Sequence, residues 1–139
     1  MTGAGPILGL DLGQSRIGVA ISDPDRRVAV PIGTIRTGAP EDVKAIAALV
    51  KENAVTRIVV GHPISLSGKA GEAADHAEKF ADALRGFLEV DVVLHDERLS
   101  TVEAERRLAG AGVDRRARRD VIDQAAAVVI LQSYLDGLR

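Results

Sequence analysis

The chain has 139 residues, a formal net charge of -2, 46% hydrophobic and 27% charged residues, and no cysteine. This length suits one domain over residues 1–139, which would bury roughly 70% of its unfolded surface. The lack of cysteine excludes disulfides, thiolate metal sites and a cysteine nucleophile. The N-terminus shows no signal-peptide pattern, and no apolar run is long enough to span a bilayer, so we expect a cytoplasmic protein.

The N-terminal half of the sequence predicts strands followed by a helix. Three strands are expected at 7–12, 16–22 and 28–36. The segment 41–54 then carries apolar residues at helical spacing, and 57–61 is a short apolar strand.

The C-terminal half predicts alternating strand and helix. A Gly- and Ser-rich loop, in which Ser65 and Ser67 precede the helix, leads into a helix that ends near Gly86, and a strand follows at 90–95. The capping-box sequence STVE opens a helix at Ser100 that ends near residue 109. We expect the segment AGAGVDRRARR to form a mobile loop, and Asp120 to cap a last, buried helix that ends near Asp136.

This order of elements, βββαβαβαα, predicts an α/β fold with a mixed five-stranded sheet flanked by helices. The first three strands would be antiparallel, and the later strands parallel with right-handed crossovers. If the strands at 7–12, 57–61 and 90–95 are parallel neighbours, their carboxyl ends share one edge of the sheet, where ligands collect in such folds.

Asp11 is the first candidate functional residue, because it lies among apolar residues inside a predicted strand. Burial of an unpartnered carboxylate is costly. The small residues Gly9 and Gly18 would leave an open patch beside Asp11 if their faces align. The structural alternative is that these glycines serve a turn and close helix packing.

Two further acids fall where acids are unusual. Glu97 follows the 90–95 strand at the same edge, and Asp123 lies in the first turn of the expected last helix, on its apolar stripe. Alternatively, Asp123 is a capping partner of Asp120, Glu97 pairs with Arg98 or Arg16, and the neighbouring Asp96 is a turn residue.

Acids that converge on one place repel one another unless a cation joins them. Oxygen ligands without cysteine favour Mg²⁺ or Mn²⁺, which can activate water and stabilise the leaving oxygen of a phosphodiester. His62, His76 and His95 are scattered and show no zinc spacing, and the chain has neither a P-loop nor a GxSxG motif.

The sequence resembles the YqgF/RuvX family, small bacterial proteins with an RNase H-like fold. The matching pieces are GLDLGQSRIGVAISD, RIVVGHP–LSG, VLHDERLSTVEAERRL and VIDQAAAVVILQSYLD, in the family's order and over nearly the whole chain. The resemblance implies a metal-dependent nuclease. It associates the chain with maturation of the 5′ end of pre-16S rRNA in ribosome biogenesis and with Holliday junction resolution in DNA recombination.

The family's acidic residues fall on Asp11, Glu97 and Asp123. The resemblance implies that Asp11 and Asp123 hold Mg²⁺ or Mn²⁺, and that Glu97 holds metal or orients the attacking water. It also implies phosphate contacts from a set of arginines, for which a solvated loop is the alternative in the 115–119 group. The set is Arg16, Arg98, Arg115, Arg116, Arg118 and Arg119.

One loop departs from the family pattern, because GHPISLSG stands where the family usually has GLPxNMDG. Its role in substrate contact is therefore open. Two other functions compete with a nuclease: a catalytically silent RNA-binding assembly factor, and an actin-like ATPase, for which the chain is too short to supply a second lobe.

The substrate, structured RNA or branched DNA, also stays open. Few aromatic residues favour recognition by backbone and shape. Junction cleavage would favour a homodimer, since two strands are cut.

Overall fold

The computed structural model describes residues 4–63, 71–97 and 115–138, with the backbone alone for 115–120. The strands are β1 (Ile7–Leu12), β2 (Arg16–Ser22), β3 (Ala29–Arg36), β4 (Arg57–His62) and β5 (Asp91–Asp96). The helices are α1 (Glu41–Glu52), α2 (Glu72–Phe87) and α4 (Arg115–Gly137). All five predicted strands are confirmed, with bounds that differ by at most one residue. The helix expected from Ser100 to residue 109 lies outside the described residues.

The strands form one sheet in the order β3-β2-β1-β4-β5. β2 is antiparallel to β1 and β3, whereas β4 is parallel to β1 and β5. The predicted mixed sheet is therefore confirmed. The carboxyl ends of β1, β4 and β5 lie at one edge of the sheet, which we call the carboxyl edge.

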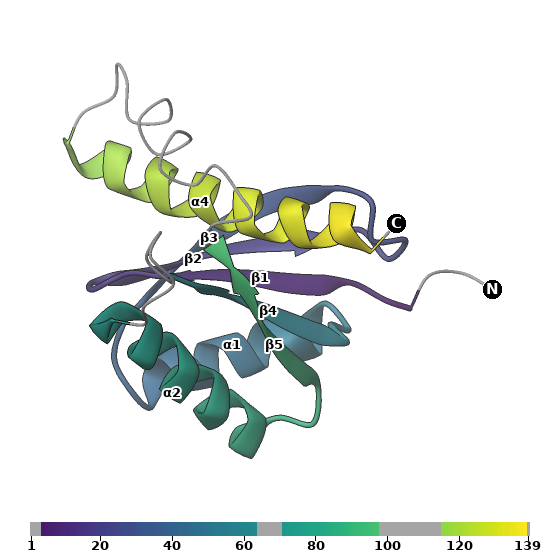
Figure 1. Cartoon of the computed structure of the whole chain (residues 1–139), viewed down its shortest axis with the longest axis horizontal. Coiled ribbons are helices and arrows are strands. Elements are labelled where there is room, and N and C mark those ends of the chain that lie inside the picture. The colour runs from purple at the N-terminus through teal and green to yellow at the C-terminus, as the bar shows by residue number, and fades with distance from the viewer. Residues whose placement is uncertain (1–3, 64–70, 98–114, 139) are drawn as a thin grey trace.

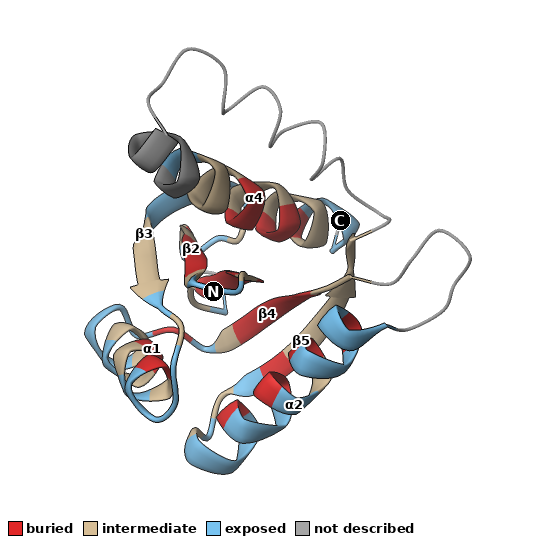
Figure 2. Cartoon of the chain, turned by 90° about the vertical axis from the view of Figure 1, so that its left-hand side faces the viewer, coloured by how far each residue is buried: buried red, intermediate tan, exposed pale blue. Residues whose placement is uncertain are grey.

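Helices cover both faces of the sheet (Figure 1). α4 lies across one face, and α1 and α2 cover the other. Side chains alternate between these faces along each strand. Ile7 and Val59 therefore pack with α4, and Leu8, Leu10 and Val60 pack with α1 and α2. Figure 2 shows the buried residues on β2, β4 and the sides of the helices that face the sheet.

α4 begins at Arg115, so the prediction of a loop up to residue 119 and a helix cap at Asp120 is wrong. Arginine and alanine are good helix formers, and the stretch RRARRD contains no glycine or proline to stop the helix. Asp123 is consequently the ninth residue of α4, in its third turn rather than its first. Its alternative role as a capping partner of Asp120 is excluded.

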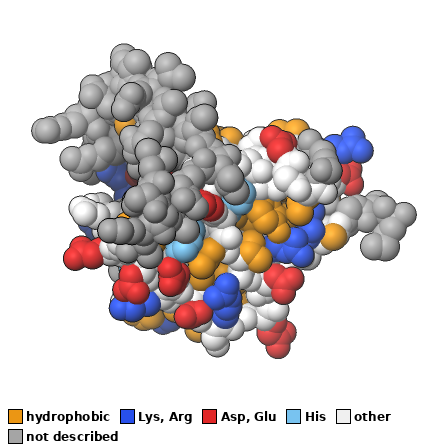
Figure 3. Space-filling model, in the orientation of Figure 1, with side chains coloured by type: hydrophobic (Ala, Val, Ile, Leu, Met, Phe, Trp, Pro, Cys, Tyr) orange, Lys and Arg blue, Asp and Glu red, His pale blue; other side chains and the backbone are white. Residues whose placement is uncertain are grey.

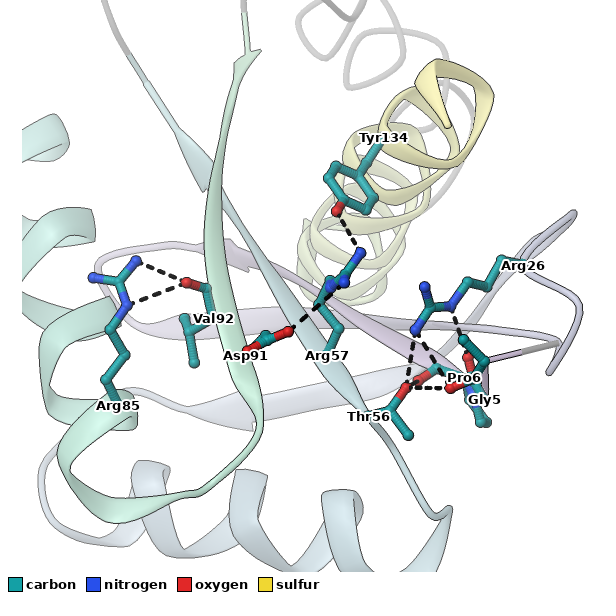
Figure 4. Close-up of polar contacts among 10 residues, drawn as sticks. Gly5, Pro6, Arg26, Thr56, Arg57, Arg85, Asp91, Val92 and Tyr134 are labelled. Atoms are coloured by element: carbon teal, nitrogen blue, oxygen red, sulfur yellow. Dashed lines mark hydrogen bonds and ion pairs between the residues drawn. The ribbon is translucent and has the colours of Figure 1, made fainter. Parts of the chain in front are cut away.

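The apolar side of α4 packs on the sheet, where Ala126, Ala127, Ile130, Leu131 and Leu135 are all fully buried. Polar contacts hold the C-terminal part of α4 in place (Figure 4). Arg57 Nη1 donates a hydrogen bond of 3.0 Å to Tyr134 Oη, and Arg57 Nη2 lies 3.7 Å from Asp91 Oδ2. These contacts join α4 to β4 and β5 at the edge opposite the carboxyl edge.

A second set of contacts in Figure 4 holds the start of the chain. Arg26 Nε donates to the Gly5 carbonyl at 3.0 Å, and its Nη2 donates to Thr56 Oγ1 at 3.0 Å. β1 is thereby held at its amino end by the β2–β3 turn and by the residue before β4. None of the helices within the described ranges combines the length and apolar content required to cross a membrane.

Candidate active site at the carboxyl edge

Asp11 lies in the central strand β1, and its side chain faces α4. Only 3% of the residue is exposed. Its direct partner on β2 is Gly18. The parallel register ends with Leu10 beside Val60, and one further step brings Gly61 of β4 alongside Asp11. Asp11 is therefore flanked by a glycine on each neighbouring strand, about 5 Å away.

Gly18 lies directly beneath the main chain of Asp123. A Cβ atom added at Gly18 would be 1.9 Å from the carbonyl oxygen of Asp123 and 2.4 Å from its carbonyl carbon. Directly opposed residues of an antiparallel pair share a face, so the Asp123 backbone and the Asp11 side chain occupy the same side of the sheet. Glycine at this position is what lets α4 approach β2 so closely.

Gly61 lies beneath the side chain of Glu97 in the same way. A Cβ atom added at Gly61 would be 3.4 Å from both Cγ and Cδ of Glu97 and 2.6 Å from Cδ1 of Ile130. Glu97 follows β5 directly, and its side chain extends over β4 towards the centre of the sheet. The structure therefore brings Asp11, Glu97 and Asp123 to one face of the carboxyl edge.

The patch around Asp11 is filled rather than open, which corrects the prediction from the small residues. α4 covers Gly18 through Asp123, and it covers Gly9 through Leu131, whose Cβ would be 2.7 Å from an added Cβ. Close helix packing explains these two glycines. The space for a ligand is thus limited to the part of the edge that α4 leaves uncovered.

Asp123 forms an ion pair with Arg16, in which Arg16 Nε lies 3.5 Å from Asp123 Oδ2. Both side chains are 22% exposed, so the pair is accessible from solvent. This ion pair ties Arg16 of β2 to α4. Across residues 4–63, 71–97 and 115–138, no three Asp, Glu or His side chains stand in an arrangement that could hold a metal ion. Metal binding by the three acids would require their side chains to reorient, Asp123 away from Arg16.

The comparisons with known proteins identify the family. The profile of the family described as "RuvX: Holliday junction resolvase" matches residues 5–137. The chain belongs to the RuvX family.

Curated relatives of this RuvX family member match almost end to end. A protein of Chloroflexus aggregans is 48% identical over 134 residues, which are 96% of this chain and 94% of the relative. A protein of Thermobifida fusca is 52% identical over 140 residues, which cover 95% and 87% of the two chains. Both carry the name "Putative pre-16S rRNA nuclease".

Solved structures confirm the expected RNase H-like fold. RuvC of Thermus thermophilus in complex with a Holliday junction substrate superposes with a TM-score of 0.56 over 96% of both chains. A second structure of Thermus thermophilus RuvC gives 0.55. The sequence identity is 14% in each case, so the likeness concerns the fold alone.

The other predicted phosphate-binding arginines are not placed by the structure. Arg98 lies outside the described residues, and Arg115, Arg116, Arg118 and Arg119 belong to the first turns of α4, described by their backbone only. α4 crosses β2 at Asp123, which lies over Gly18, so these arginines belong to the part of the helix that precedes the site.

Asp96, for which a turn was the alternative, and its partner His62 lie on the other face of the sheet. His62 is the last residue of β4 and Asp96 the last of β5, and they are direct partners, so neither belongs to a loop or turn. His62 Nε2 lies 2.8 Å from Glu78 Oε2 on α2. This arrangement anchors the start of the atypical GHPISLSG loop on the face opposite the acids.

His95 supports the site from the α4 face. Its Nε2 is 3.0 Å from Ser133 Oγ, and its ring meets the Tyr134 ring edge-on at a centroid distance of 5.7 Å. Because His95 is the direct partner of Gly61 and comes two residues before Glu97, these contacts fix the strand that carries Glu97. No pattern in the sequence assigned a role to His95, and only its packing against α4 shows one.

Because of His95, we expect the free energy of unfolding to decrease when the pH drops below about 6.5. Burial lowers the pKa of His95 from its ordinary 6.5, and the Asp96 carboxylate partly offsets this shift. Between the folded and the unfolded pKa, the unfolded chain binds more protons than the folded one. The contribution of neutral His95 to the free energy of unfolding is therefore complete above the unfolded pKa, and it is lost as the pH falls through the folded pKa. Urea unfolding at about pH 7.5 and about pH 5 measures the loss.

His95→Gln should show a smaller loss of stability over this range than the wild type. His76 is exposed on α2, and His76→Gln is the matched control, expected to behave as the wild type does. Equal losses in His95→Gln and the wild type would contradict the assignment.

Proposed function

We propose that this protein is a Mg²⁺- or Mn²⁺-dependent nuclease that processes the 5′ end of pre-16S rRNA in the cytoplasm. The observation that carries the proposal is the placement of Asp11, Glu97 and Asp123 on one face of the carboxyl edge in a chain that belongs to the RuvX family. The names of its relatives support the choice of substrate.

Asp11 and Asp123 would hold the metal, and Glu97 would hold it as well or orient the attacking water. Their carboxylates supply only oxygen ligands, which suits Mg²⁺ and Mn²⁺. Such an ion supplies Lewis-acid stabilisation of the phosphodiester and lowers the pKa of water. The chain's own contribution is positional: Asp11 is fixed by the central strand, Asp123 by α4 and Glu97 by the end of β5.

The Arg16–Asp123 pair gives Arg16 a role in this proposal. While the pair is closed, the guanidinium neutralises Asp123 next to two other acids. If Asp123 held a metal ion, the Arg16 guanidinium would lose this partner and would contact a phosphate group. Arg98 and the arginines at 115–119 would add further phosphate contacts.

Cleavage of Holliday junctions is the second candidate, and the description of the matching family favours it. Cutting two strands of a junction would favour a homodimer. The apolar side of α4 is buried against the sheet, so a dimer would have to use another surface.

The test is a cleavage assay with purified protein and Mn²⁺. A labelled pre-16S rRNA leader and a four-way DNA junction are offered side by side, with EDTA as the metal-free control. We expect cutting of the RNA near the mature 5′ end, lost in EDTA. Cutting of the junction alone would replace the first candidate by the second. Binding of RNA without any cutting would contradict both and identify a non-catalytic assembly factor.

A further inference from the structure

A second arginine lies beside Arg16 on the same face as the acids. Arg16 on β2 and Arg36 on β3 are direct partners in the antiparallel ladder, in the same register that pairs Gly18 with Thr34. Opposed residues share a face and have Cβ atoms about 5 Å apart. Gly18 faces Asp123 of α4, so both arginines also lie on the α4 face of the sheet. Arg16 precedes Gly18, the partner of Asp11, by two residues along β2. We call Arg16 and Arg36 the arginine pair.

Like charges at directly opposed positions destabilise a sheet, and in the arginine pair only one charge is compensated. Arg16 has Asp123 at 3.5 Å. The Arg36 side chain is exposed, and it makes no hydrogen bond or ion pair with the residues that the structure describes. Over α2, in contrast, acidic and basic side chains are interspersed (Figure 3). The start of β2 and the end of β3 therefore carry one guanidinium, that of Arg36, whose charge no described acid balances.

The backbone beneath the arginine pair is held by hydrogen bonds on both sides. Thr37 donates from its N–H to the Ser15 carbonyl at 2.9 Å and from Oγ1 to the Gly13 carbonyl at 3.2 Å. Gly13 N–H donates to the Arg16 carbonyl at 2.9 Å. On the other side, the buried Asp42 carboxylate accepts from Gly38 N–H at 3.1 Å. The two arginines thus project from a rigid platform, which reduces the entropy lost when they bind a ligand.

We propose that the arginine pair is a phosphate-binding site that holds the backbone of the nucleic-acid substrate next to the acids, with Arg36 as its main contact. Two guanidinium groups on one face match the oxygens of a phosphodiester, and an anion between them removes their mutual repulsion. Along β2 the pair is about 7 Å from Gly18, the partner of Asp11, so the phosphate would be held close to the reacting one. This inference rests on the proposed function for the identity of its ligand.

The test measures binding of a labelled single-stranded oligonucleotide by fluorescence anisotropy in EDTA, over a series of salt concentrations. Each phosphate contact contributes about 0.7 to the slope of log affinity against log salt. R36Q should lower the slope by about 0.7 and weaken binding about fivefold at roughly 0.1 M salt. R36K, which keeps the charge, should largely retain the slope.

Lys51 offers the matched control, because it is exposed in the last turn of α1 and K51Q makes the same change in net charge at the opposite edge of the sheet. K51Q should bind as the wild type does. If R36Q and K51Q bind alike, the proposal is wrong. A competition experiment with inorganic phosphate at matched ionic strength distinguishes the phosphates of a nucleic acid from free phosphate as the ligand. Phosphate binding by the wild type, with the oligonucleotide slope of R36Q unchanged, would assign the pair to free phosphate and overturn the proposal.

A stability measurement distinguishes a ligand site from a structural role. Removal of one of two opposed like charges should leave the urea midpoint of R36Q unchanged or raise it, and a lower midpoint would contradict the argument from repulsion. Binding in EDTA is also independent of cleavage. If the wild type cuts neither substrate but R36Q still lowers the slope, the proposed function fails and the arginine pair stands. If the wild type cuts while R36Q binds as K51Q does, the proposed function stands and the arginine pair is not a phosphate-binding site.

Discussion

Asp11→Asn is expected to reduce metal-dependent cleavage by at least about a hundredfold while the fold persists. The central strand holds Asp11 almost completely buried between Gly18 and Gly61, over which the other two acids lie. Loss of an outer-shell group alone typically costs 10- to 100-fold in affinity or activity, so loss of a direct ligand should cost more. Asparagine has nearly the same shape and carries no charge. Crowding of acids on this face should therefore be relieved, and the stability of the metal-free protein should be unchanged or higher.

The same substitution has a readout that does not depend on cleavage. A ligand that binds only the folded state raises the free energy of unfolding by RT ln(1 + [L]/Kd). Mn²⁺ should therefore raise the melting temperature of the wild type and have little effect on Asp11→Asn. Glu89→Gln, an exposed residue just before β5 at the opposite edge, makes the same change in charge and should respond to Mn²⁺ as the wild type does. An equal Mn²⁺ response in Asp11→Asn would exclude Asp11 from the metal site.

Gly18→Ala is expected to be strongly destabilising and to lower cleavage as well. The new Cβ would meet the main chain of Asp123 at 1.9 Å, a distance that no side-chain rotation can relieve. α4 would have to move away from β2, and Asp123 would move with it. Overpacking of a core typically costs about 1–3 kcal/mol, and a clash with a whole helix backbone should reach or exceed the upper end of that range.

Gly86→Ala is the control for this substitution. Gly86 lies inside α2, and a Cβ added there meets nothing within 4 Å. Alanine at an exposed helix position should stabilise the protein by roughly 0.5–1 kcal/mol. Urea unfolding of the two variants against the wild type measures both effects. A Gly18→Ala protein as stable as the wild type would show that α4 does not lie on Gly18 in solution.

Local patterns in the sequence were sufficient to predict the five strands and a mixed sheet, but not the order of its strands. Apolar runs and turn residues act over a few neighbours, so the strands followed from them, whereas the parallel pairing of β1, β4 and β5 was only a condition that the structure fulfils. The start of α4 was missed for the same reason. An apolar period marks only the apolar part of a helix, and it begins after residues 115–120, which are charged except for Ala117. The arginines and the alanine there are good helix formers, and they extend the helix beyond that period.

The sequence by itself determined the fold class, the family and the three candidate acids, because strand pattern, turns and motifs are properties of short segments. Only the tertiary structure decided how these acids meet. The crossing of α4 over Gly18 fills the patch that the small residues were expected to leave open, and it pairs Asp123 with Arg16. The register of β2 and β3 places Arg36 opposite Arg16. Register and helix crossing depend on contacts between residues far apart in the chain, which no local pattern encodes.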